Sequence, residues 1–310
     1  MQSLRRLSWI ALVLAFAQIV FGAIVRITGS GMGCGEHWPK CNGAWFPPHD
    51  RIDLVIEITH RYLALGLSLV IAALVIAAFT RRREPGIGGR GGVLRPAAAA
   101  AFLVVAAALL GAVTVKLALN PLVIAGHLTI AMSLLAVLAV VLFRAGGLGA
   151  SADLSGGTAR TQRSARIAVV MALFTLVFGA LTANLPDAAS SCSGFPLCRT
   201  ITAGGSALSV HIVHRVIAFL LFGHLLGIMI STSRRGDPVI VVRAARVAFG
   251  AAVAQVLIAA LMIEMQFPAV FRSLHQATGA FVWLAVVSLG IVASHASSIK
   301  PEPAIVRVAA

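Results

Sequence analysis

Long apolar blocks separated by shorter polar gaps make up most of the chain. Each block is close to, or longer than, the roughly 20 residues that a helix needs to cross a bilayer. The pattern therefore predicts an all-α integral membrane protein with eight transmembrane helices. The predicted spans are 9–25, 54–79, 96–117, 122–143, 167–183, 207–230, 244–264 and 270–293.

Composition and charge agree with a membrane protein. Of the 310 residues, 59% are hydrophobic and 11% are charged, whereas a soluble domain carries about a quarter charged residues. The net charge of +15 could indicate nucleic-acid binding, but the arginines concentrate in alternate gaps, at 81–95, 144–166 and 234–246. This is the positive-inside distribution. We expect a multi-pass protein of the plasma membrane with both termini in the cytoplasm and no nucleic-acid partner.

An internal repeat divides the chain into two halves. Each half has a Phe-Gly-Ala triplet, two cysteines in the next loop, a His-Arg pair early in the second span and a histidine in the fourth. We predict two duplicated four-helix bundles in the same orientation, at 1–145 and 165–295, with a flexible linker at 146–164 and a tail at 296–310. The repeated residues are Phe21-Gly22-Ala23, Cys34, Cys41, His60-Arg61 and His127, then Phe178-Gly179-Ala180, Cys192, Cys198, His214-Arg215 and His275.

Four histidines lie inside apolar spans at similar depth, His60 and His127 in the first half and His214 and His275 in the second. Each is six or seven residues from the same end of its span, or about 10 Å along the helix. Intramembrane histidines are costly and usually functional, although one alone could simply hydrogen-bond between helices. Two histidines on facing helices can ligate a haem iron. Zinc or copper fits less well, because no Cys or Asp lies at that depth.

Further charged and polar residues lie beside the histidines, and one position differs between the two halves. Arg61 and Arg215 each follow a histidine and could pair with a haem propionate, or could extend to lipid headgroups. Glu57 lies one turn before His60, on the same helix face, where the second half has His211. A buried carboxylate beside a haem can act as a base or stabilise positive charge. We therefore predict that the first half reacts and that the second retains a cofactor.

The four cysteines form two pairs in loops placed outside the cytoplasm, Cys34 with Cys41 and Cys192 with Cys198. That compartment is oxidising, so we expect one disulfide in each loop. Each disulfide could shape a cap over a haem pocket or could be a redox-active pair that passes electrons, and the sequence does not separate these roles.

Together these motifs resemble the haem A synthase family over nearly the whole chain. The resemblance is carried by the segments 22–31, 57–61 and 211–215, by Cys34, by Trp38-Pro39-Lys40-Cys41, and by His127 and His275. It implies oxidation of the C8 methyl group of haem O to a formyl group through successive hydroxylations with oxygen from water, which supplies haem A to cytochrome oxidase.

The resemblance also implies roles for individual residues. His214 and His275 would hold a resident haem b with Arg215, and His60 and His127 would bind the substrate with Arg61. Glu57 would act in catalysis, and Cys34 and Cys41 match a loop pair associated with thiol chemistry in the family.

The resemblance also implies partners, and other functions remain possible for the same residues. The expected partners are haem O, an electron acceptor, haem O synthase, cytochrome oxidase assembly proteins and the lipid bilayer. Three other functions would use some of the same residues. They are an electron-carrying membrane cytochrome b, a haem transporter or chaperone, and a quinone-linked thiol oxidoreductase that uses the cysteines alone.

Overall fold

The computed structural model describes residues 1–47, 51–147 and 154–298. Within them lie eight helices that are long and apolar enough to cross a membrane, so the predicted fold class is confirmed. The helices are α1 (Gln2–Ile27), α2 (Ile52–Thr80), α3 (Leu94–Lys116), α4 (Pro121–Arg144), α5 (Ala159–Asn184), α6 (Gly205–Arg235), α7 (Val239–Glu264) and α8 (Ala269–Ala296). A short 3-10 helix, η1 (Ser30–Met32), follows α1, and two-residue strands β1 (Cys192–Ser193) and β2 (Thr200–Ile201) pair antiparallel between α5 and α6.

Several helices extend beyond their apolar blocks. α1 begins at Gln2 and α5 at Ala159, each well before the start predicted from hydrophobicity. Polar and basic residues can continue a helix past the hydrocarbon while their charged groups stay in water. Part of the range predicted as a linker, 146–164, therefore belongs to α5. Residues 148–153 of that range and 299–310 of the predicted tail lie outside the described residues.

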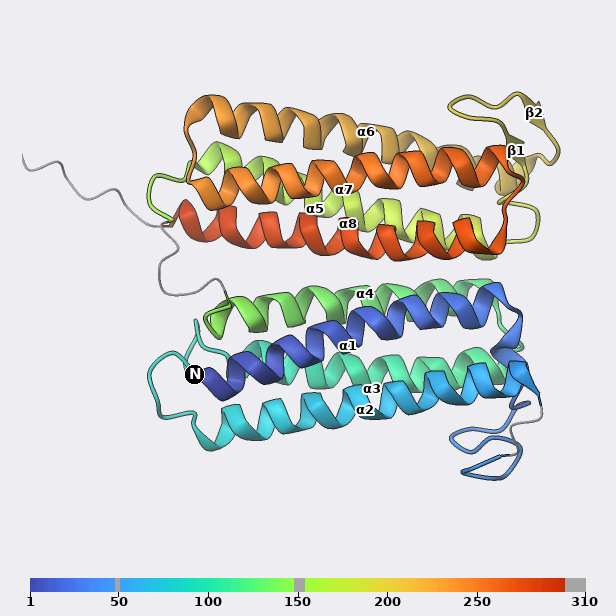
Figure 1. The fold of residues 1–310 in the computed structure, drawn as a ribbon, viewed down its shortest axis with the longest axis horizontal. Coiled ribbons are helices and arrows are strands. Elements are labelled where there is room, and N and C mark those ends of the chain that lie inside the picture. Colours follow the sequence, from blue (N-terminus) through green and yellow to red (C-terminus); the bar gives the residue numbers. More distant parts are fainter. Residues whose placement is uncertain (48–50, 148–153, 299–310) are drawn as a thin grey trace, which may run out of the picture.

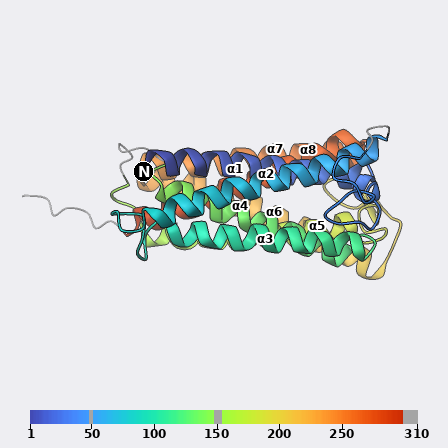
Figure 2. The ribbon, with the colours of Figure 1, turned by 90° about the horizontal axis from the view of Figure 1, so that it is seen from below.

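The helices form two groups of four (Figures 1 and 2). In the first group, α1, α2, α3 and α4 contact one another in sequence order and α4 returns to α1; α5, α6, α7 and α8 repeat this order. The groups meet through α1, α4, α5 and α8. At this interface the Trp283 indole N–H donates to the Met132 carbonyl oxygen at 2.8 Å. The packing order is the one that a duplicated bundle requires, and the duplication itself remains a prediction.

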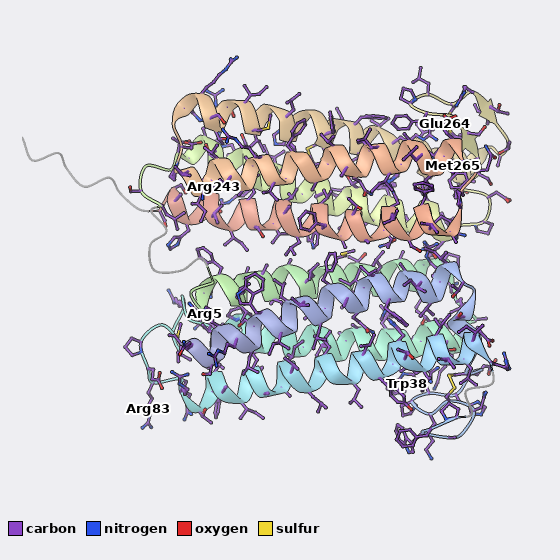
Figure 3. The ribbon with its side chains drawn as sticks, viewed as in Figure 1. Arg5, Trp38, Arg83, Arg243, Glu264 and Met265 are labelled. Carbon is purple, nitrogen blue, oxygen red and sulfur yellow. A yellow bond between two sulfur atoms is a disulfide. The ribbon has the colours of Figure 1, made fainter. Side chains whose placement is uncertain are left out.

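The two ends of the molecule differ in chemistry. Figure 3 shows Arg5, Arg83 and Arg243 at one end, called here the arginine-rich end, and Trp38 and Glu264 at the other. This second end carries both cysteine loops and is called the cysteine-loop end. The separation is the one that the alternating arginine clusters predict.

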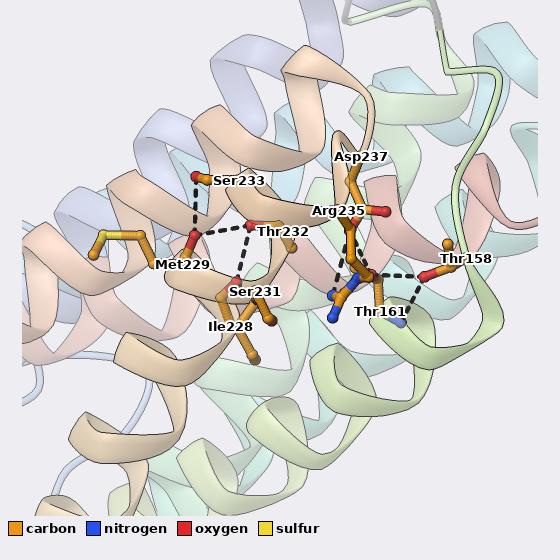
Figure 4. A network of polar contacts seen from close by, with 9 residues as sticks. All are labelled: Thr158, Thr161, Ile228, Met229, Ser231, Thr232, Ser233, Arg235 and Asp237. Atoms are coloured by element: carbon orange, nitrogen blue, oxygen red, sulfur yellow. Dashed lines mark hydrogen bonds and ion pairs between the residues drawn. The ribbon is translucent and has the colours of Figure 1, made fainter.

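A polar network joins the start of α5 to the turn between α6 and α7 at the arginine-rich end of the second half (Figure 4). Thr161 Oγ1 donates to Asp237 Oδ2 at 2.5 Å, and Arg235 Nη2 lies 3.4 Å from the same oxygen. Arg235 also donates to Thr161 Oγ1 at 2.8 Å, while Thr158 Oγ1 caps α5 by accepting from the Thr161 backbone N–H. Asp237 is buried, so this neighbouring cation offsets its desolvation. The network fixes the α6–α7 turn against the start of α5.

Candidate functional site

His60 lies against the backbone of α1. A methyl group added at Gly22 would lie 3.0 Å from His60 Cε1, so the imidazole occupies space that only glycine leaves open. Gln18, one turn earlier on α1, donates to the His60 carbonyl oxygen at 3.0 Å, and its amide nitrogen lies 3.4 Å from His60 Nε2. The ring of Phe21 stacks on the imidazole with centroids 6.3 Å apart. Helix α1 therefore fixes the position of this histidine.

His127 of α4 is the second buried histidine of the first half. Its ring lies near Gly111 of α3, where an added methyl group would be 3.3 Å from Cε1. His60 and His127 are close enough for charges on the two rings to repel each other. The Nδ1 atoms of both rings are buried without a hydrogen-bond partner among the described residues. The structure thus brings together the two residues predicted to bind the substrate haem.

His214 repeats the arrangement of His60 in the second half. A methyl group at Gly179 would lie 2.9 Å from His214 Cε1. The ring Nδ1 lies 3.0 Å from the Thr175 carbonyl oxygen, which can only accept, so Nδ1 carries the proton. That tautomer leaves the Nε2 lone pair for a metal, the arrangement in which a carbonyl oxygen orients a metal-bound histidine.

His275 faces the same cavity as His214. The cavity has a volume of about 240 Å³, and its lining is mainly apolar side chains of α5, α6, α7 and α8. Gln255 of α7 donates to the His275 carbonyl oxygen at 3.0 Å, and its amide nitrogen lies 3.1 Å from the ring Nδ1. The amide oxygens of Gln18 and Gln255 are buried and have no partner among the described residues.

Glu57 and Arg61 hold the first cysteine loop. Glu57 is buried; its Oε2 accepts the Cys34 backbone N–H at 2.8 Å, and its Oε1 pairs with Arg61. Arg61 Nη1 donates to the carbonyl oxygens of His37 and Lys40 at 2.8 and 3.0 Å. Both side chains thus contact the loop. The predicted contact of Arg61 with a propionate remains a prediction, as does the catalytic role of Glu57.

His211 and Arg215 make the equivalent contacts in the second half. His211 Nδ1 lies 2.8 Å from the Ala188 carbonyl oxygen, and Arg215 Nε donates to His211 Nε2 at 3.0 Å. Arg215 Nη1 and Nη2 donate to the carbonyl oxygens of Gly194 and Cys192 at 2.8 and 2.9 Å. His211 stands at the position that Glu57 has in the first half. Like Glu57, it connects the loop after the preceding helix to the arginine one turn later, but with a neutral imidazole ring in place of a carboxylate.

Both predicted disulfides are present, between Cys34 and Cys41 and between Cys192 and Cys198. Cys34 and Cys41 have no exposed surface. Gly33 lies directly on the start of α2, because a methyl group there would be 2.8 Å from the Asp53 carbonyl carbon. The loop that carries this disulfide therefore packs closely against α2, and whether the bond is structural or redox-active remains a prediction in either sense.

The histidine pairs fit a haem better than a bare metal ion. In the described part of the chain, no group of three or more His, Cys, Asp or Glu side chains could hold a metal. Two imidazoles complete a coordination sphere when a porphyrin supplies the other four ligands. The mainly apolar cavity lined by His214 and His275 leaves room for a flat apolar group in the second half.

Four residues that lie at these sites in the structure were not predicted from the sequence to take part in them. Gln18 and Gln255 contact the histidines directly, whereas Arg26 and Arg272 line the second-half cavity. The contacts of the two glutamines could have been predicted from the sequence, because an amide side chain in the middle of an apolar helix needs a hydrogen-bond partner. Arg26 belongs to α1 of the other half, and only the packing of the two halves brings it to this cavity.

Comparison with known proteins shows the family of the chain. The chain is 27% identical over 240 residues to the haem A synthase of Bacillus licheniformis, which covers 76% of this chain and 77% of that protein. It is 28% identical to the haem A synthase of Alkalihalophilus pseudofirmus, over 69% of this chain and 71% of that protein. A segment of 74 residues, 23% of each chain, is 43% identical to the haem A synthase of Geobacillus kaustophilus. The model of the COX15-CtaA family, described as cytochrome oxidase assembly protein, matches residues 5–287. The chain therefore belongs to the COX15-CtaA family.

Proposed function

We propose that this protein is a haem A synthase that oxidises the C8 methyl group of haem O to a formyl group. The observation that carries the proposal is the repeated histidine site. In each half, the histidine of the second helix lies against a glycine of the first helix, and a second histidine comes from the fourth helix. The relatives named haem A synthase support a role in haem A synthesis.

The two halves take different roles in this proposal. His60 and His127 bind haem O in the first half, and His214 and His275 hold a resident haem b in the second. A haem b bound there would supply one-electron redox chemistry at its iron. The difference between Glu57 and His211 supports the assignment, because the first half alone places a carboxylate one turn before the histidine.

The reaction balances with water as the oxygen source. Each hydroxylation joins a water oxygen to the methyl carbon of haem O and releases two electrons and two protons. After the second hydroxylation, the gem-diol loses water and a formyl group remains. Four electrons and four protons leave in total, so the enzyme also needs an electron acceptor, which we propose as its further partner.

Glu57 is suited to stabilising charge in this reaction. Arg61 and the Cys34 N–H both contact its carboxylate. A fixed negative charge beside the first-half histidine stabilises positive charge that develops on the substrate's methyl carbon. Both oxygens already accept hydrogen bonds, so this electrostatic role fits the contacts better than that of a general base.

The proposed setting is the plasma membrane, with the arginine-rich end in the cytoplasm and the cysteine loops outside. This orientation places both termini in the cytoplasm and follows from the alternating arginine clusters. Haem O synthase and cytochrome oxidase assembly proteins are the proposed protein partners, because the substrate and the product are both haems that must pass between membrane proteins.

Pigment analysis tests the function. The protein would be expressed together with a haem O source and purified, and its extracted haems would be separated by chromatography and identified by mass. We expect haem A, or its hydroxylated intermediate, together with haem b. Haem b alone with unchanged haem O, when a suitable electron acceptor is supplied, would favour an electron-carrying cytochrome b or a haem transporter.

A further inference from the structure

The described residues that line the cavity between His214 and His275 include positively charged side chains and no negatively charged one. Arg26, Arg215 and Arg272 all line it, and its lining contains no Asp or Glu. The remaining surface is mostly apolar. Partly buried guanidinium groups such as those of Arg26 and Arg272 are costly unless an anion or several acceptors compensate them.

Arg215 is already compensated by protein groups. Its three nitrogens donate to His211 and to carbonyl oxygens of the second cysteine loop. The other two arginines differ. Arg26 donates from Nη1 to the Ala183 carbonyl oxygen at 3.0 Å, and the guanidinium group of Arg272 has no hydrogen bond or ion pair with any residue that the structure describes. Most of the donor groups of Arg26 and Arg272 are therefore available to a ligand.

Arg26 and Arg272 also lie close to each other. They are near enough for their charges to repel, which disfavours the arrangement unless an anion lies between them. A carboxylate satisfies both requirements, because its two oxygens accept hydrogen bonds from guanidinium groups and its charge removes the repulsion.

The two arginines lie beyond the histidines, toward the cysteine-loop end. Arg272 precedes His275 by three residues on α8, so both project from the same helix face, about one turn apart. Arg26 lies four residues after Gly22 on α1 and reaches Ala183, four residues after Gly179 on α5. The backbone positions of Arg26 and Arg272 thus lie about 5 Å, one turn, from the level of the histidines.

We propose that Arg26 and Arg272 bind a propionate carboxylate of the haem that His214 and His275 hold. This inference rests on the proposed function. Because Arg26 belongs to the first half, the cofactor site of the second half is complete only when α1 packs against it. One helix then contacts both sites, through Gln18 and Gly22 at the substrate histidine and through Arg26 at the cofactor.

The experiment compares haem b binding and haem b midpoint potential in R26Q, R272Q and the matched control R243Q. Arg243 is an exposed arginine at the opposite end of the molecule (Figure 3). We expect R26Q and R272Q to bind haem b about 10- to 100-fold more weakly, as the loss of a charge-assisted hydrogen bond implies. The midpoint potential of haem b should become more negative, because loss of the positive charge beside the propionate favours the oxidised iron. R243Q should match the wild type.

A charge-conserving variant separates ligand binding from misfolding. R272K keeps the positive charge without the planar pair of donors, so it should restore the potential more fully than the affinity. Unchanged haem b content and potential in both R26Q and R272Q would overturn the inference. Loss of haem b in R272Q with no restoration of the potential in R272K would also overturn it, as this would indicate a structural role.

The same preparations keep the two proposals distinguishable. If the wild type forms haem A but R26Q and R272Q behave like R243Q, the arginine site fails and the synthase function stands. If the wild type binds haem b and forms no haem A, while the variants lose haem b, the function fails and the arginine site stands.

Discussion

The glycines beneath the histidines allow each half to be perturbed separately. In G179A the new methyl group would lie 2.9 Å from His214 Cε1, whereas ordinary contacts begin at 3.4 Å, so the ring must move by about 0.5 Å (3.4 − 2.9). The ring cannot simply rotate away, because its Nδ1 bonds to the Thr175 carbonyl oxygen. Such overpacking typically costs about 1–3 kcal/mol, which corresponds to roughly 5- to 150-fold weaker binding of the haem that His214 ligates.

G22A is the matching change in the first half, with the methyl group 3.0 Å from His60 Cε1. We expect G179A to lower haem b content and to alter its absorption spectrum. G22A should lower the yield of haem A and leave haem b content unchanged. Both quantities come from the extracted haems of the purified variants, normalised to protein.

Gly227 supplies the control. It lies in the interior of α6, is exposed, and has no atom within 4 Å of an added methyl group. Alanine there should stabilise the helix slightly, by up to about 1 kcal/mol, and G227A should retain both haems. Normal haem b in G179A would refute the reasoning, and so would equal loss of haem b in G22A and G179A.

Two further predictions concern the residues assigned to chemistry. E57Q keeps an oxygen for the Cys34 N–H but removes the negative charge, so we expect it to retain haem b and to form no haem A; a normal haem A yield, measured by chromatography, would contradict the role of Glu57. H214A should lose the resident haem b, whereas H60A should keep it and lose substrate binding. Comparable haem b loss from both histidine variants, measured as pyridine haemochrome, would contradict the division of roles between the halves.

The fold was predictable because its determinants are local. Apolar blocks of sufficient length define the helices, and the repeated order of motifs predicts which helices form each half. The histidine pairs were predictable for the same reason, since the cost of an imidazole in hydrocarbon can be recognised without any knowledge of the packing.

The contacts of the arginines were less predictable. Arg61 and Arg215 follow histidines, which suggests a propionate partner, yet in the structure they donate to carbonyl oxygens of the cysteine loops. No local pattern specifies where a loop places its carbonyl groups. Arg26 is a stronger example, because its position at the cavity depends on how two separately formed bundles pack together.

The two cysteine loops lie at opposite corners of one end of the molecule (Figure 1), the first beside α2 and the second beside α6. The interface between the halves, formed by α1, α4, α5 and α8, separates them. Under the proposed assignment, the substrate haem and the resident haem therefore bind in bundles on opposite sides of this interface, and each bundle has a cysteine loop of its own.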